Sequence, residues 1–190
     1  MLKDLLLKNR SCRRFCQKER IPADELRRWV DNTRYCASGR NLQPLKYVLV
    51  HSEEGCAEVF PLLKWAGYLP DWDGPEEGER PVAYIVQLLD TTLTENPLCD
   101  EGLQLQALTL SAVEAGYACC IIKAFQADAL REVLHLPSHL KPCYVVAVGK
   151  GVEEVKLEAM KDQEVRYWRT PDKVHHVPKR TLEEILQGAF

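Results

Sequence analysis

Residues 100–122 have the sequence DEGLQLQALTLSAVEAGYACCII, which joins the longest helical pattern of the chain to a short apolar segment. Aspartate is favoured near the N-cap of a helix, and Asp100 opens this pattern, which predicts a helix over residues 100–115. Gly116 follows that helix, and the apolar residues 118–122 predict a short buried strand. This helix–strand unit is the starting point for the fold prediction.

The same alternation of helices and apolar strands extends in both directions along the chain. Further strands are predicted at residues 46–51, 81–88 and 143–149. Helices are predicted at residues 2–8, 23–36, 53–64, 126–135 and 181–186. Strands that are apolar along their whole length indicate a sheet that is covered by helices on both faces. The polar tail 152–190 has little to bury by itself, so we expect it to wrap a second subunit.

Length and composition predict one globular domain, residues 1–190. The chain is 46% hydrophobic and 28% charged, which excludes a disordered or fibrous protein. Its net charge of −3 argues against a nucleic-acid partner. The charge is unevenly spread, because residues 1–28 hold nine basic and four acidic side chains. This asymmetry favours a local anionic ligand, such as a phosphate.

Sequence features of membrane insertion and secretion are absent. No apolar segment is long enough to span a bilayer, and the N-terminal residues do not have the pattern of a signal peptide. The eight cysteines are therefore expected to be free thiols with structural roles in a cytoplasmic protein.

The common catalytic motifs are also absent. The sequence has neither a P-loop nor a Gly-x-Gly-x-x-Gly motif, and it has no nucleophile elbow and no zinc-finger spacing of cysteines. His175 and His176 are adjacent and could bind a metal, but a packing or surface role is the favoured interpretation, and no metal site is predicted. If the protein is an enzyme, a cofactor is expected to supply the reactivity.

Two segments carry side chains suited to an anionic, aromatic ligand. Residues 10–15 place Arg10, Ser11 and Arg13 close together, and guanidinium groups match phosphate oxygens in a bidentate manner. Residues 37–44 contain Asn41 and Gln43, whose amides can bond to the edge of a heteroaromatic ring. The alternatives are a solvated basic loop and ordinary turn chemistry.

Cations at the other end of the chain, within residues 176–180, would complement the first segment if both ends converged on one phosphate.

The order of these segments carries a family resemblance. Residues 9–15 match an opening R-R-S-x-R-x-F motif, residues 37–44 match P-S-x-x-N-x-Q-P, and residues 81–86 match an apolar strand. Residues 100–118 match a helix motif that ends in glycine, and residues 178–180 match P-K-R. Over residues 2–186 the sequence resembles the FMN-dependent nitroreductase family.

That resemblance implies a three-layer α+β sandwich, with a central mixed sheet and helices on both faces. It also implies an intertwined homodimer, with FMN at the interface. Arg10, Ser11 and Arg13 would hold the FMN phosphate, with Arg180 and Lys179. Other predicted cofactor-binding residues are Ala37, Ser38, Asn41 and Gln43, acting on the partner's flavin, and the strand residues Ile121, Ile122 and Lys123 beside the ring.

The sequence departs from the family motifs at several positions, including Gly-Tyr-Ala at residues 116–118 in place of Gly-Leu-Gly. Asn9 replaces an arginine, Ala37 replaces a proline, and Lys123 replaces the glycine that usually lies beside the flavin. Lys123 could stabilise reduced flavin, or it could face solvent and offer only its backbone.

By resemblance, the protein is expected to be an FMN-dependent oxidoreductase. It would pass reducing equivalents from NAD(P)H to a small-molecule electron acceptor, such as a nitroaromatic or quinone, in a ping-pong scheme. This scheme needs no catalytic side chain. The alternatives are a non-catalytic flavin-binding or redox-sensing protein and a structural module without cofactor.

Overall fold

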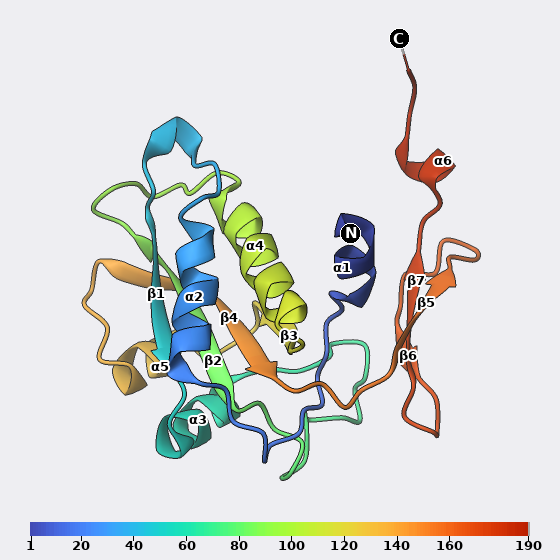
Figure 1. Cartoon of the computed structure of the whole chain (residues 1–190), viewed down its shortest axis with the longest axis horizontal. Helices are drawn as coiled ribbons and strands as arrows, with labels where there is room; N and C mark the ends of the chain where they lie inside the picture. Colours follow the sequence, from blue (N-terminus) through green and yellow to red (C-terminus); the bar gives the residue numbers. More distant parts are fainter. Residues whose placement is uncertain (190) are drawn as a thin grey trace.

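A four-stranded sheet forms the centre of the molecule, for which a computed structural model describes residues 1–189 (Figure 1). In spatial order the strands are β1 (Leu45–Val50), β2 (Ala83–Asp90), β4 (Leu140–Gly149) and β3 (Ala118–Ile122). All four predicted strands are confirmed. β2 begins two residues later than predicted, after Pro81, which lacks the N–H group that a sheet ladder requires.

The mixed character expected for this central sheet is wrong, because every hydrogen-bonded pair in it is antiparallel. α4 (Asp100–Glu114) connects β2 to β3, and these two strands do run in the same direction. β4 lies between them, however, and is antiparallel to both. The alternation of helices and strands therefore predicted the strands without predicting which of them pair.

The remaining helices follow the predicted positions; the first has the predicted span and the others are shorter. They are α1 (Leu2–Lys8), α2 (Ala23–Thr33), α3 (Glu53–Val59), α5 (Ala127–Val133) and α6 (Leu182–Ile185), with short 3₁₀ turns at Gly39–Asn41 and Phe60–Leu62. The helix predicted over 53–64 changes to a 3₁₀ turn at Pro61, because proline cannot donate the next helical hydrogen bond. Within residues 1–189, no helix is both long and apolar enough to cross a bilayer.

Both faces of the central sheet bury apolar side chains. On one face, Trp29 of α2 and Leu108 of α4 pack with Ile85 and Val146, and all four are at most 1% exposed. On the other face, side chains of α3 and α5 pack against the intervening strand residues, which include Tyr84 and Val145. Successive strand residues point to opposite faces, so continuous apolar strands follow from burial on both sides.

The tail forms a second, three-stranded sheet that was not predicted. Its strands are β5 (Val155–Ala159), β6 (Trp168–Arg169) and β7 (His175–Lys179), with β7 in the middle. β5 is parallel to β7 and β6 is antiparallel to it. In the view of Figure 1, α1 lies between α4 and this tail sheet, and α6 extends away from the body. The final residue, 190, belongs to the predicted tail but lies outside the described residues.

Candidate functional site

A cavity of about 320 Å³ lies where the N-terminal segment, α4, the edge strand β3 and the tail sheet meet. It is lined by Asn9, Arg10, Ser11, Arg13, Gln106, Thr109, Cys119, Ile121, Val155, Tyr167, His175, Val177 and Lys179. Four of the residues predicted to hold a phosphate therefore line one cavity, although they come from opposite ends of the chain. None of its lining residues is acidic.

The N-terminal segment is held against the edge of the sheet by backbone and side-chain contacts. The Cys12 N–H donates to the carbonyl of Cys119 at 2.9 Å, and Ser11 bridges the same strand residue in parallel. Phe15 is fully buried, and its ring lies so close to Gly149 that a Cβ there would approach it to 2.9 Å. These contacts fix the direction in which Ser11 and Arg13 leave the sheet edge.

Arg13 lies among side chains that leave its charge unpaired. Its backbone N–H donates to Glu153 Oε2 at 2.7 Å, but the Glu153 carboxylate forms its ion pair with Arg169, at 2.6 Å. The Arg13 guanidinium contacts His175 Nε2 at 3.2 Å and lies 5.0 Å from the centroid of the Tyr167 ring. Its charge is therefore available to an anion in the cavity.

Arg14, the next residue, has the opposite environment. Its Nε and Nη2 both donate to the Glu79 carboxylate at 2.5 Å, in a bidentate pair. This contact raises the pKa of Arg14 and lowers the pKa of Glu79. Arg14 does not line the cavity.

The other cations differ in their relation to the cavity. Arg10 donates to the Leu6 carbonyl at 2.8 Å, and burial lowers the pKa of its guanidinium. Lys179 lines the cavity from β7, on the same face as His175. Arg180 contacts Gln163 and Glu184 and is not among the lining residues. Lys179 is the last residue of β7, and Arg180 follows the strand with its side chain turned toward Gln163 and Glu184.

The predicted ring-binding loop is anchored elsewhere, at the start of α4. Ser38 Oγ donates to Asp100 Oδ2 at 2.6 Å, and the Gly39 N–H donates to Oδ1 at 2.9 Å. Asp100 is 1% exposed, and this anchoring role was not predicted. Gln43 Nε2 donates to Asn41 Oδ1 at 3.2 Å.

The backbone of this loop is unusual. Asn41 and Gln43 have φ values of 56° and 49°, in the left-handed region that few side chains adopt. Ala37 is exposed at the start of the same loop.

A single chain does not bring the two predicted site segments together. Asp100 anchors the loop, while Thr109, nine positions later on α4, accepts a 2.8 Å hydrogen bond from Asn9 beside the cavity. At 1.5 Å per helical residue, the two anchors are about 14 Å apart along α4.

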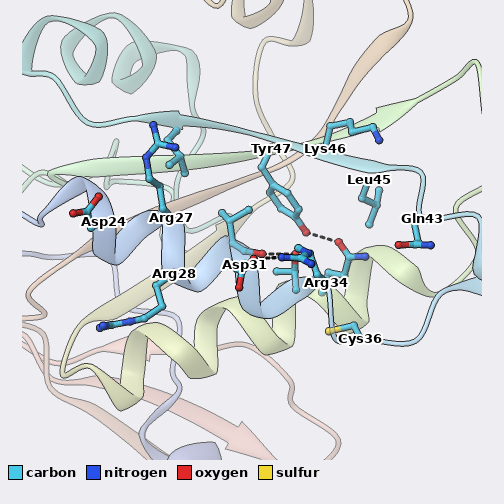
Figure 2. A pocket seen from close by; sticks show the side chains of 14 residues that line it. Asp24, Arg27, Arg28, Asp31, Arg34, Cys36, Gln43, Leu45, Lys46 and Tyr47 are labelled. Atoms are coloured by element: carbon cyan, nitrogen blue, oxygen red, sulfur yellow. Dashed lines mark hydrogen bonds and ion pairs between the residues drawn. The ribbon is translucent and has the colours of Figure 1, made fainter.

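A larger hollow of about 840 Å³ lies between α2 and β1, and Gln43 borders it (Figure 2). Its floor holds a hydrogen bond from the Tyr47 hydroxyl to Gln104 Oε1, at 2.7 Å. Two of its arginines, Arg28 and Arg34, are paired with nearby carboxylates. The cavity at Arg13 is therefore the better anion site, although it has the smaller volume.

The predicted residues Ile121 and Ile122 lie in β3, the outer strand of the central sheet, and Lys123 follows directly after it. Ile121 lines the cavity and is 39% exposed, whereas Ile122 is buried in the core. The Cys119 carbonyl accepts a hydrogen bond from Cys12, which lies outside the sheet. The backbone hydrogen-bonding groups of successive strand residues point in alternate directions. The peptide groups of Ile121 and Lys123 therefore face that same outer edge.

The Lys123 side chain has partners within the chain. Its Nζ donates to the Cys143 carbonyl at 3.0 Å and lies 4.2 Å from the centroid of the Tyr144 ring.

Buried thiols are poor nucleophiles here. Burial raises the pKa of both Cys12 and Cys120 to about 11, so neither forms an appreciable thiolate near neutral pH. Across residues 1–189, no group of three or more His, Cys, Asp or Glu side chains is arranged to hold a metal.

The nitroreductase family model matches residues 6–71 and 91–150, which is most of the chain. The chain belongs to the nitroreductase family. Both predicted site segments fall within the matched residues, and so does β3. The tail residues that line the cavity, from Val155 to Lys179, lie beyond them.

Solved structures with the same fold include several nitroreductases. A protein from Exiguobacterium sibiricum, described as a nitroreductase and solved in complex with FMN, has a TM-score of 0.68 and 19% identity over 80% of this chain and 89% of that one. An FMN-dependent nitroreductase from Clostridium difficile has a TM-score of 0.66 and 19% identity, over 83% and 91% of the two chains.

A third similar structure, from Parabacteroides distasonis, is named as an NADH dehydrogenase or NAD(P)H nitroreductase. It has a TM-score of 0.65 and 19% identity, over 85% of this chain and 92% of that one. No protein of curated function matches the sequence. These likenesses show the fold, and the family match shows the family.

Proposed function

We propose that this nitroreductase is an FMN-dependent oxidoreductase that transfers reducing equivalents from NAD(P)H to a small electron acceptor, such as a nitroaromatic or quinone. The observation that carries the proposal is the cavity at Arg13. Three basic side chains line it, no acidic side chain does, and the nearest carboxylate, that of Glu153, is paired with Arg169.

The donor set of this cavity fits the phosphate of FMN. Arg10, Arg13 and Lys179 would supply the positive charge and Ser11 a neutral donor, because charge-assisted bonds to phosphate are the strong ones. We leave Arg180 out of this group, since its side chain contacts Gln163 and Glu184.

The isoalloxazine ring would lie along the outer edge of β3. The peptide groups of Ile121 and Lys123 face that edge, and Ile121 also lines the cavity. Ile122 would contribute only its place in the strand, because its side chain is in the core. The Lys123 ammonium, held by Cys143 and Tyr144, would lend a positive charge near the ring without contacting it.

The loop 37–43 is proposed to act on the flavin of a second subunit, in an intertwined homodimer with a three-layer arrangement. The loop is about 14 Å along α4 from the Asn9 anchor, so its Ala37, Ser38, Asn41 and Gln43 serve a site other than the one in their own chain.

Two surfaces support an interface with the tail of a partner. β1 is at the end of the sheet order, with a hollow on each side of it. The tail exposes Leu182, Ile185 and Leu186, each more than half exposed, and such apolar side chains indicate a contact surface.

Bound FMN would supply the electron transfer itself, which needs no acid, base or nucleophile from the protein. The chain's own residues bind the phosphate, orient the ring along β3 and keep the thiols nearby in the unreactive protonated form.

Absorption spectroscopy of the purified protein, reconstituted with FMN, tests the proposal. We expect a flavin spectrum that NADH or NADPH bleaches under anaerobic conditions and that a quinone restores. A flavin spectrum that neither nucleotide bleaches would indicate a non-catalytic flavin-binding or redox-sensing protein. Failure to bind FMN at all would refute the flavin site. Light scattering at micromolar concentration tests the homodimer, and a monomeric mass would contradict it.

A further inference from the structure

His175 of the tail is the fully buried neighbour of Arg13, and no part of the proposed electron transfer uses it. It is 0% exposed, and it lines the cavity beside the proposed phosphate site. The residue lies outside the segments that the family match covers.

The contact with Arg13 fixes the protonation state of the imidazole. A guanidinium has only donors, so the 3.2 Å contact between Arg13 Nη1 and His175 Nε2 makes Nε2 the acceptor. The ring is then neutral and carries its proton on Nδ1, which is buried and has no partner among the described residues. Burial and the nearby charges of Arg13 and Arg169 lower the pKa of His175 to about 4, which agrees with a neutral ring.

The Tyr167 ring lies close to both Arg13 and His175. Its ring centroid lies 5.0 Å from the Arg13 guanidinium carbon and 5.0 Å from the centroid of the His175 ring. The Tyr167 hydroxyl in turn accepts a hydrogen bond from the Tyr68 N–H at 3.3 Å. The tail therefore supplies an aromatic face and a neutral imidazole acceptor to the guanidinium, whose Nη1 also donates to the Ser11 carbonyl at 3.3 Å.

A neutral acceptor has a consequence that a carboxylate would not have. Glu79 also fixes Arg14, through two bonds of 2.5 Å, but it cancels the charge of that arginine. An acceptor without charge orients a guanidinium and leaves its charge to attract an anion. His175 and Glu79 thus give two neighbouring arginines fixed positions with opposite electrostatic results.

We infer that His175 is a positioning residue that holds the Arg13 guanidinium toward the FMN phosphate while leaving its charge unneutralised. The inference rests on the proposed FMN site and extends it, because it makes the tail a part of the phosphate site in the same chain. The tail then has a role in cofactor binding besides any contact with a partner subunit.

Three substitutions of His175 separate orientation from packing and from charge. His175→Phe keeps a ring beside Tyr167 and removes the acceptor. His175→Gln supplies a neutral acceptor, and His175→Glu supplies a charged one. The readout is the ratio of the dissociation constants for riboflavin and FMN, measured by quenching of flavin fluorescence, because only FMN carries the phosphate.

We expect wild-type protein to bind FMN more tightly than riboflavin. His175→Phe should reduce that preference roughly tenfold, the size expected when a charge-assisted bond is misplaced. His175→Gln should restore it to within about threefold, whereas His175→Glu should reduce it at least as much as His175→Phe, because a carboxylate neutralises Arg13.

His176→Phe is the matched control. His176 lies on the other face of β7, where it contacts Glu158 at 2.7 Å and stacks on Trp168, so its replacement should leave the preference unchanged. Equal loss of FMN and riboflavin binding in His175→Phe would indicate a packing role and overturn the inference.

If His175→Phe does not fold, the comparison of the Gln and Glu variants decides. Equal preferences in those two would also overturn it. Wild-type protein without any preference for FMN would instead refute the proposed phosphate site itself.

Discussion

The cavity at Arg13 and the loop 37–43 both border α4, yet they use their polar groups in opposite ways. The cavity gathers basic side chains and leaves their charge unmatched, with Glu153 already paired to Arg169. The loop bonds its own donors within the chain, to Asp100 and between Gln43 and Asn41. The first region therefore has the charge that a bound anion requires, and the polar groups of the second stabilise the conformation of the loop.

The largest expected effect tests the unmatched charge of the cavity. Arg13→Ala should weaken FMN binding about tenfold to a hundredfold, because a charge-assisted hydrogen bond contributes ~1.5–3 kcal/mol. Riboflavin binding should change much less, since riboflavin has no phosphate. Titration of flavin fluorescence measures both constants.

Arg14→Ala is the control for this change. It breaks the bidentate pair with Glu79, so the melting temperature should fall, but the preference for FMN over riboflavin should stay. If the two alanine variants lose FMN preference equally, residues 10–15 are only a solvated basic loop.

The loop side of the comparison is tested through its anchor. Asp100→Ala leaves the Ser38 hydroxyl and the Gly39 N–H without their acceptor, which costs ~1–3 kcal/mol for buried groups. We expect a lower free energy of unfolding in urea, and an equal loss of FMN and riboflavin affinity. Asp128→Ala, at the exposed start of α5, should leave both quantities near wild type. A loss confined to FMN would place the loop at the phosphate instead.

The two regions also differ in how far the sequence predicted them. The converging cations were predictable, since their residue types and order match a phosphate site. Successive side chains of an extended segment point to opposite sides, which also predicts different surroundings for Arg13 and Arg14. What holds each of them was not predictable: Glu79 lies in a turn-rich loop without periodicity, and His175 lies on a strand of five residues.

Short strands are the general reason that the tail was missed. β6 has two residues and β5 has five, which is too few for a period-two pattern to stand out in a polar segment. The strands of the central sheet were predictable because burial on both faces makes them apolar throughout. Their pairing order depends on the position of β4 between β2 and β3, and no local sequence pattern predicts that position.

A smaller expected effect is a dependence of the free energy of unfolding on pH, and it arises from His175 in the cavity. The pKa of His175 is lowered to about 4 in the folded protein by burial and by Arg13, from about 6.5 in an unfolded chain. Between those pH values the unfolded chain binds more protons, so the free energy of unfolding should fall as pH drops from about 6.5 toward 4.

Urea titrations at several pH values measure that slope. His175→Gln should flatten it, because glutamine does not titrate. A slope that is unchanged in His175→Gln would mean that other groups dominate in this range.

The smallest expected effect separates neighbouring cations on β7. Arg180→Ala should change FMN affinity by less than about twofold, because Arg180 contacts Gln163 and Glu184. Lys179→Ala should weaken FMN binding several-fold with little change for riboflavin, because Lys179 lines the cavity. The reverse order in fluorescence titrations would mean that the tail turns when FMN binds.

The cavity's division between the two ends of the chain has a consequence for biosynthesis. Lys179 is added 169 residues after Arg10 during translation. At ~5–20 residues per second, roughly ten to thirty seconds separate the translation of the two ends. A nascent chain that stops before Lys179 lacks one wall of the proposed phosphate site, so tight loading of the proposed cofactor would wait until that residue has been added.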